Sequence, residues 1–329
     1  MNIMVLKKLL YSVVGCMLFT SCYDEDALTP GDRVLESRFE FPQGSNSWDE
    51  EAQDILDEFG IYLIYKNYAE DDFNRSWTGG TGGGGFQSNY TGSDLNDTQA
   101  EEAIAFMQKH IFTYLNRDVI QKALPPYIYL AYDLSARTEF IPGYPAKSNV
   151  NISFEGLDYW AISWGGIQEI STGLGTPPIT SPIAPPTTAK ECWKMRGEFM
   201  QVTFRKAIEN GGIEMPTGFG DNFDYKTAIQ YADAYKDDPN YYMMRGFPGK
   251  MGFSGFNLSP IYKVTEMNPE KCFIAYVQMC MYYTREEFES QFASTYTLLA
   301  ETRQQVVDYM KEKYNIDLEA IAKGPDIAQ

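Results

Sequence analysis

The segment from residue 188 to residue 209 most constrains how this chain can fold. Thr187 or Thr188 can cap a helix there, and Asn210-Gly211-Gly212 supplies the residues that close one. Two apolar stripes follow this helix, one of Cys192, Met195, Phe199 and Val202 and one of Trp193, Met200, Phe204 and Ile208. A helix that is apolar on two sides needs cover on both, so we expect it at the centre of the domain.

Helix and strand patterns alternate before this helix, whereas the patterns after it are mainly helical. Hydrophobic spacing predicts helices over about 47–59 and 98–115, a helix that starts at Asn268-Pro269, and a last helix from the capping box Thr284–Glu287 to about Tyr314. Strands are predicted over 61–65, 127–132 and 158–164, and an irregular connection over 173–186. These elements predict an α+β fold with a small N-terminal sheet and a largely helical C-terminal half.

The first residues have the pattern of a lipoprotein signal. Lys7 and Lys8 precede an apolar run that ends in Thr20-Ser21-Cys22. The run is shorter than the roughly 20 residues of a membrane-spanning helix, and small residues before a cysteine resemble a bacterial lipobox. We expect cleavage before Cys22 and acylation of Cys22, where two or three acyl chains anchor a protein firmly. The alternative is an ordinary signal peptide in which Cys22 is incidental.

An acidic run, Tyr23-Asp24-Glu25-Asp26, follows the cysteine. It resembles the surface-export signal of Bacteroidetes lipoproteins, which favours the outer face of the outer membrane. The alternative is a plain acidic tether, and this alternative would change only the side of the membrane on which the domain lies. The predicted organisation is a signal peptide over 1–21, an acidic linker over 22–46 and one domain over 47–329.

Charge and residue counts exclude several classes of protein. Lys and Arg number 27 and Asp and Glu 45, a formal net charge of −18, so we expect no nucleic-acid partner. The only histidine is His110, and with no second histidine we interpret it as a packed side chain. Outside the signal region the cysteines are Cys192, Cys272 and Cys280, an odd number that we expect to be buried and unpaired. The glycine run 79–85 lacks the ending of a phosphate-binding loop and is expected to be a surface loop.

The central helix contains Gly197-Glu198-Phe199-Met200-Gln201. In HExxH zinc peptidases two histidines, four residues apart on one helical face, bind the metal, and the glutamate after the first histidine is the general base. Here the glutamate is present and both histidines are absent. A GExxQ string also occurs by chance in many helices.

Four further segments are similar to segments of one known protein family and occur in the same order along the chain: Phe59–Tyr65, Gly252–Gly255, Cys272–Ala275 and Tyr314–Leu318. Over roughly residues 47–322 the sequence thereby resembles the zinc-binding metallopeptidase family of Bacteroidetes lipoproteins. The resemblance implies a zincin-like fold in which Gly197 and Gln201 stand at the zinc-histidine positions and Ala275 at that of the last acidic ligand. These residues cannot complete zinc's usual shell, so we predict no zinc, no other cofactor and no catalytic residue of that type. Glu198 is expected to pair with a nearby base or to have a raised pKa.

These patterns favour a surface-anchored lipoprotein with a degenerate metallopeptidase domain. The resemblance implies a binding or accessory role near an outer-membrane uptake complex, with a peptide or glycan as ligand. One alternative is an active hydrolase, either a peptidase with other metal ligands or a carboxylate-dependent glycosidase. Another is a glycan-binding module that stacks sugars on Trp160 and Trp164, although buried sheet core is the more frequent place for such residues.

Overall fold

The computed structural model describes residues 38–69, 71–75, 88–141, 144–173, 175–252 and 255–325. The chain divides into residues 1–40 and a compact unit of residues 41–329, which the following paragraphs describe. The predicted signal peptide, Cys22, the acidic run after it and the glycine run 79–85 lie outside the described residues. Within the described residues, no helix combines the length and the apolar character that a membrane span requires.

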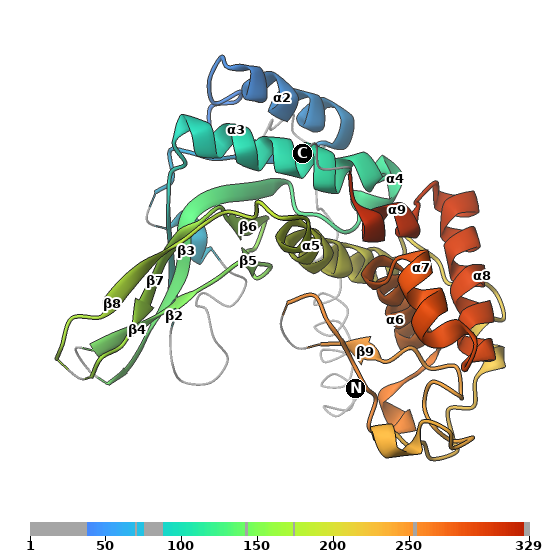
Figure 1. The fold of residues 1–329 in the computed structure, drawn as a ribbon. Helices are drawn as coiled ribbons and strands as arrows, with labels where there is room; N and C mark the ends of the chain where they lie inside the picture. The colour runs from blue at the N-terminus through green and yellow to red at the C-terminus, as the bar shows by residue number, and fades with distance from the viewer. Residues whose placement is uncertain are drawn as a thin grey trace, which may run out of the picture. The chain divides into compact units, whose positions relative to one another are not determined.

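A six-stranded sheet forms one half of this unit, and its longest strand joins two smaller groups of strands (Figure 1). Its strands are β1 (Tyr62–Ile64), β2 (Ser88–Ser93), β3 (Tyr127–Ile141), β4 (Tyr144–Asn149), β5 (Ile152–Ser153) and β6 (Tyr159–Ser163). The first part of β3 pairs in parallel with β1 and β6, and β5 is the antiparallel edge strand beside β6. The second part of β3 pairs with β2 and β4, both antiparallel, and extends away from the helices as an arm.

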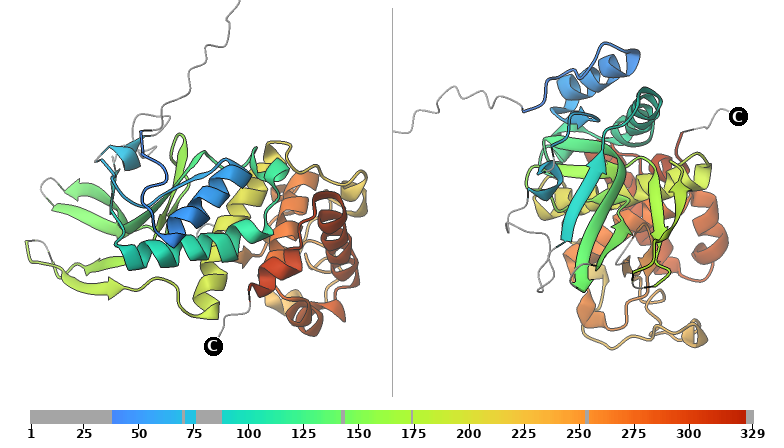
Figure 2. Two further views of the ribbon diagram at one scale, coloured as in Figure 1. Left: turned by 90° about the horizontal axis from the view of Figure 1, so that it is seen from above. Right: turned by 90° about the vertical axis from the view of Figure 1, so that its left-hand side faces the viewer.

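Helices α2 (Ser47–Phe59) and α3 (Asp97–Phe106) lie side by side over the sheet (Figures 1 and 2). A capping box at Asn46 begins α2, and Gly60 ends it at a φ of 74°, a left-handed conformation that glycine adopts without strain. After α3 the chain makes a π-helical turn (Met107–Ile111), a 3₁₀ turn (Phe112–Tyr114) and the short α4 (Arg117–Ile120).

The predicted central helix is α5 (Ala189–Glu209), capped by the Thr188 side chain. Phe199 and Met200 are fully buried and Phe204 is almost so, and the Phe199 ring packs edge-on against Trp160 of the sheet. α5 runs between the sheet and the C-terminal helices (Figures 1 and 2), so its predicted central position is confirmed.

The rest of the chain is largely helical. Its longer elements are α6 (Pro269–Tyr282), α7 (Arg285–Phe288), a π-helical turn (Glu289–Ala293), α8 (Thr297–Tyr314) and α9 (Leu318–Lys323). Short elements of this part are the 3₁₀ turns Phe219–Asn222, Asp233–Tyr235 and Val264–Glu266 and the two-stranded pair β9 (Lys250–Met251) and β10 (Leu258–Ser259). One further 3₁₀ turn, Asp72–Asn74, lies earlier in the chain, between β1 and β2. The α+β class, with a sheet in the N-terminal half and helices in the C-terminal half, is confirmed.

Three predicted elements are wrong in part. The predicted helix over about 98–115 is an α-helix only to Phe106, after which it continues as the π-helical and 3₁₀ turns. Part of the segment 173–186 is a strand, β8 (Ile179–Ile183), which forms a hairpin with β7 (Gly166–Ile170). Pro182 is tolerated there because β8 pairs only with β7 and so is an edge strand. The expected single helix from Thr284 to Tyr314 is interrupted, since a π-helical turn follows α7 before α8 begins.

Candidate functional site

The first expected zinc-histidine position, Gly197, is covered by an aromatic ring. A Cβ atom at residue 197 would lie 2.0 Å from Cδ1 of Phe256. The Phe256 ring is buried and contacts Trp193 of α5 and Tyr282 of α6, with centroid separations of 4.9 and 5.1 Å. Any side chain at position 197 would therefore have to displace this ring from the cluster.

The second expected position, Gln201, makes hydrogen bonds through both ends of its amide group. Its amide nitrogen donates to the carbonyl oxygen of Gly255 at 2.8 Å, and its amide oxygen accepts from the side chain of Gln278 at 2.8 Å. The same Gln278 nitrogen donates to the carbonyl oxygen of Asn257 at 3.0 Å. These hydrogen bonds attach the segment 255–257 to α5 and α6, whereas Oε1 of Gln278 is buried without a partner among the described residues.

Sequence reasoning did not single out Gln278. It lies one turn after Ala275 on α6, is 2% exposed, and is the α6 residue that reaches Gln201. A glutamine in the apolar run Val277–Met281 is the one signal that could have pointed to it. Gly197, Gln201 and Gln278 offer no nitrogen, sulfur or carboxylate ligand, so this cluster does not fit zinc.

Glu198 lies beside these residues but turns toward the sheet. It is half-buried, and burial raises its pKa above the ordinary value, while the Lys194 charge and a hydrogen bond from Asn151 act in the opposite direction. The expectation that Glu198 would have a raised pKa agrees with this direction. A carboxyl group of this kind retains a proton more readily than an exposed one.

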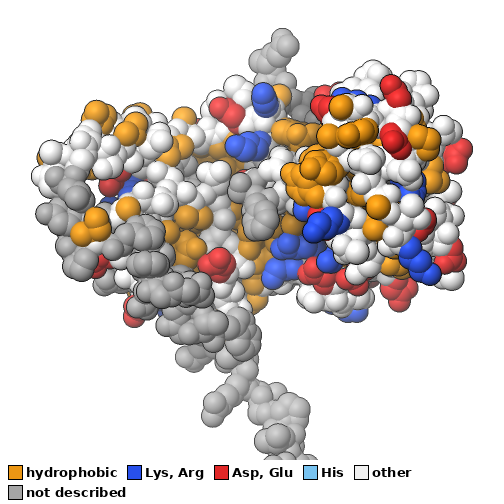
Figure 3. Space-filling view, turned by 90° about the horizontal axis from the view of Figure 1, so that it is seen from below, with side chains coloured by type: hydrophobic (Ala, Val, Ile, Leu, Met, Phe, Trp, Pro, Cys, Tyr) orange, Lys and Arg blue, Asp and Glu red, His pale blue; other side chains and the backbone are white. Residues whose placement is uncertain are grey.

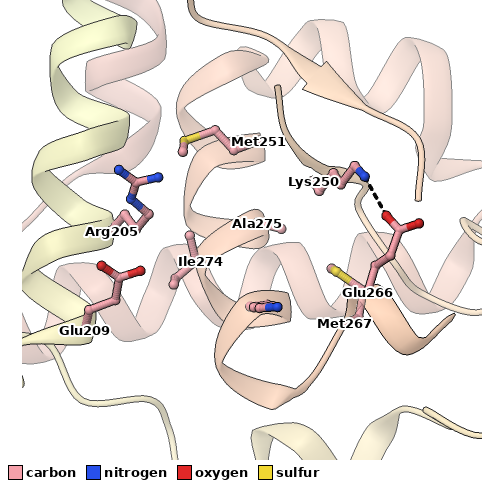
Figure 4. Close-up of a pocket in the computed structure, with 9 residues that line it drawn as sticks. Arg205, Glu209, Lys250, Met251, Glu266, Met267, Ile274 and Ala275 are labelled. Atoms are coloured by element: carbon pink, nitrogen blue, oxygen red, sulfur yellow. Dashed lines mark hydrogen bonds and ion pairs between the residues drawn. The ribbon is translucent and has the colours of Figure 1, made fainter. Parts of the chain in front are cut away.

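Ala275 lines a pocket next to the amide pair, which we call the α5–α6 pocket. Its volume is about 460 Å³. It is lined by Arg205, Glu209, Lys250, Met251, Glu266, Met267, Lys271, Ile274 and Ala275 (Figure 4). Arg205 and Glu209 follow Gln201 by one and two turns of α5, so the pocket continues along the two helices from the Gln201–Gln278 pair.

The charged groups of this pocket differ in their partners. Lys250 is paired with Glu266, with a distance of 2.5 Å between Nζ and Oε2. Arg205 makes no hydrogen bond or ion pair with any described residue, and its Nε is buried without a partner. From below, the molecule shows Lys and Arg side chains gathered beside hydrophobic ones toward the helical half (Figure 3). The α5–α6 pocket thus combines an unpaired guanidinium with an apolar wall.

The lone histidine belongs to a different, structural cluster. Nδ1 of His110 lies 3.0 Å from Arg196 of α5, which also donates to the carbonyl oxygens of Ile321 and Ala322. Burial, followed by the charges of Arg196 and Lys109, lowers the pKa of His110 to about 4. His110 is therefore neutral near pH 7 and accepts a hydrogen bond from Arg196.

The other candidate residues are also buried. Trp160 and Trp164 are 2% and 3% exposed, so they are sheet core and offer no open surface for a sugar. Cys192, Cys272 and Cys280 are free and buried, as predicted. In the described part of the chain, no three His, Cys, Asp or Glu side chains come together in a group that could hold a metal.

Comparison with known proteins gives few matches. No family model and no curated protein matches the sequence. Among solved structures, the chain is similar to a "putative zinc-binding metallo-peptidase" from Bacteroides caccae, with a TM-score of 0.43 and 9% sequence identity. The match covers 85% of this chain and 92% of the Bacteroides chain.

Proposed function

We propose that this chain is a binding or accessory protein whose metallopeptidase-like domain has lost its zinc site. The observation that carries the proposal is the filled site on α5. There the Phe256 ring covers Gly197, and the Gln278 side chain donates a hydrogen bond to Gln201. A catalytic zinc needs three protein ligands and an open position for water. Here both the ligand atoms and the open space are replaced by packed side chains.

The proposal also includes a cellular location, the outer surface of the outer membrane, which is supported by the sequence alone. Lys7, Lys8 and the apolar run before Cys22 favour export and acylation, and the acidic run after Cys22 favours the outer surface of the outer membrane. There the domain would bind a peptide or a glycan as an accessory of an outer-membrane uptake complex.

One preparation of the protein tests both the loss of the zinc site and the lipid anchor. The full chain is purified from membranes of the expressing cells, dialysed against zinc and then against metal-free buffer. Its zinc content is measured by plasma mass spectrometry, its intact mass is recorded, and hydrolysis of fluorogenic casein is assayed. We expect far less than one zinc per chain, no hydrolysis, and a mass that lacks residues 1–21 and carries acyl chains on Cys22.

The variant Glu198→Gln controls the hydrolysis assay. Hydrolysis that is the same in both proteins comes from a contaminating peptidase and leaves the proposal intact. Zinc near one per chain, together with hydrolysis that Glu198→Gln abolishes, would show that Glu198 acts as a general base and would refute the loss of the site.

A further inference from the structure

We propose that the α5–α6 pocket binds a small organic ligand that carries one carboxylate and one apolar group. The inference rests on the proposed function, because it assigns a ligand to a protein that binds without cleaving. Pockets of a few hundred Å³ with an apolar lining and a few placed polar groups are typical of small-molecule sites. The α5–α6 pocket, at about 460 Å³, has this composition.

Arg205 supplies the strongest part of the argument. Its guanidinium lies on the pocket side of α5 (Figure 4) and has no partner among the described residues, although its Nε is buried. A buried donor without a partner costs free energy, which a ligand oxygen would recover. Guanidinium groups match carboxylates in shape and bind them through two parallel hydrogen bonds.

The remaining charges define one negative position for the ligand. Lys271, in the first turn of α6, lines the same pocket with a side chain that makes no ion pair in the described part of the chain. Lys250 is already neutralised by Glu266. Arg205 and Lys271 therefore attract a carboxylate, whereas Glu209 disfavours a second negative group and can accept a hydrogen bond from an amine.

The apolar wall selects the rest of the ligand. Met251, Met267, Ile274 and Ala275 line the pocket opposite and beside the charged groups (Figure 4). Methionine side chains adapt their shape to an apolar group. An apolar amino acid has this combination of groups, whether it is free or forms the C-terminal residue of a short peptide.

Calorimetric titration of the full chain in detergent tests the assignment with four probes: leucine, N-acetyl-leucine, N-acetyl-leucinamide and galacturonate. We expect N-acetyl-leucine to bind saturably and N-acetyl-leucinamide, which differs from it only in the loss of the carboxylate, to bind at least about tenfold more weakly. Leucine binding more tightly than N-acetyl-leucine identifies a free amino acid as the source, through Glu209. The opposite order identifies a peptide C-terminus.

Two variants locate the site. Arg205→Gln should weaken N-acetyl-leucine binding by about tenfold or more, because it removes a charge-assisted pair of hydrogen bonds. Lys206→Gln is the matched control, since Lys206 is the next residue of α5 but lies over the Trp160 ring on the sheet side, 5.7 Å from its centroid. It should change the dissociation constant less than about twofold.

Three outcomes would overturn the inference: N-acetyl-leucinamide binding as well as N-acetyl-leucine, Arg205→Gln binding like the wild-type chain, or no saturable binding of either leucine carboxylate. Binding of galacturonate alone would also overturn it, because the apolar wall would then have no role. The amide comparison needs no variant, so it holds even if Arg205→Gln fails to fold. If the chain is zinc-free and inactive but binds none of these probes, the proposed function stands and only the ligand assigned to the pocket is refuted.

Discussion

At the scale of single residues, the packing of the site on α5 depends on Gly197, which has no side chain. Glycine within a helix usually costs up to about 1 kcal/mol relative to alanine. Gly197 sits in the middle of α5 because the Phe256 ring occupies the volume that a Cβ would need, only 2.0 Å from Cδ1. The glycine is therefore explained by packing as well as by the loss of a zinc ligand.

This packing makes Gly197 and Phe256 energetically coupled. In the wild-type chain, Gly197→Ala should lower the free energy of unfolding by about 1–3 kcal/mol, because overpacking outweighs helix propensity. In a Phe256→Ala background the same change should be neutral or stabilise by up to about 1 kcal/mol, since the ring is gone. Urea unfolding of the four proteins measures this cycle. Equal effects of Gly197→Ala in both backgrounds would mean that the ring does not press on residue 197.

At the scale of elements, the β7–β8 hairpin depends on a buried lysine. The Lys147 side chain on β4 is 2% exposed. Its Nζ donates to both carboxylate oxygens of Asp133, at 2.9 and 2.7 Å, and to the carbonyl oxygen of Ile167 on β7 at 2.7 Å. The backbone N–H of Ile167 donates to Asp133 as well, at 2.8 Å. The ion pair of Lys147 with Asp133 lies within the arm, and both of its members hold the β7 backbone at Ile167. Lys147 also lies 3.9 Å from the Glu169 carboxylate of β7.

Loss of this lysine should loosen the hairpin locally. In Lys147→Met, amide hydrogen exchange within β7 and β8 should accelerate by about tenfold or more, because a hydrogen bond to a charged group contributes about 1.5–3 kcal/mol. The matched control is Arg137→Met, which removes a more exposed pair with Glu169 and should contribute at most about 1 kcal/mol. The same acceleration in both variants would contradict the role given to Lys147.

At the scale of the whole molecule, the Arg196–His110 cluster joins distant parts of the chain. Arg196 lies on α5, His110 in the π-helical turn after α3, and the carbonyl groups of Ile321 and Ala322 in α9. Arg196 is 2% exposed, so its positive charge is held by carbonyl and imidazole acceptors. Protonation of His110 would remove one acceptor and place two positive charges side by side.

Global stability should therefore depend on pH through His110. Its folded-state pKa of about 4 is below the ordinary value of 6.5, so the unfolded chain takes up the proton first. The contribution is fully present above about pH 6.5 and is lost as the pH falls toward 4, by at most about 3 kcal/mol.

The variant His110→Gln retains an acceptor for Arg196 and does not titrate. The difference in unfolding free energy between the two proteins, measured in urea from pH 7.5 to 4.5, should change by an amount of this order. The raised pKa of Glu198 acts in the opposite direction but is common to both proteins and cancels. A difference that stays constant over this range would place His110 in contact with water.

Patterns among residues close together in the sequence were sufficient to predict many of the helices and strands. Two apolar stripes predicted a central α5, a threonine cap and a proline after asparagine placed the starts of α5 and α6, and the apolar runs predicted β1, β3 and β6. These features depend on neighbours along the sequence, which is why one chain alone reveals them. β8 and the break before α8 were missed because an exposed edge strand and a π-helical turn depend on partners elsewhere in the structure.

The sequence by itself determined what is lacking on α5, since Gly197 and Gln201 carry no ligand whatever surrounds them. The tertiary structure decided what replaces the ligands: Phe256 over Gly197, Gln278 bonded to Gln201, and Arg205 left unpaired beside an apolar wall. Those residues come from segments far apart in the sequence. Their meeting depends on how α6 and the segment 255–257 pack against α5, and no local pattern encodes that packing.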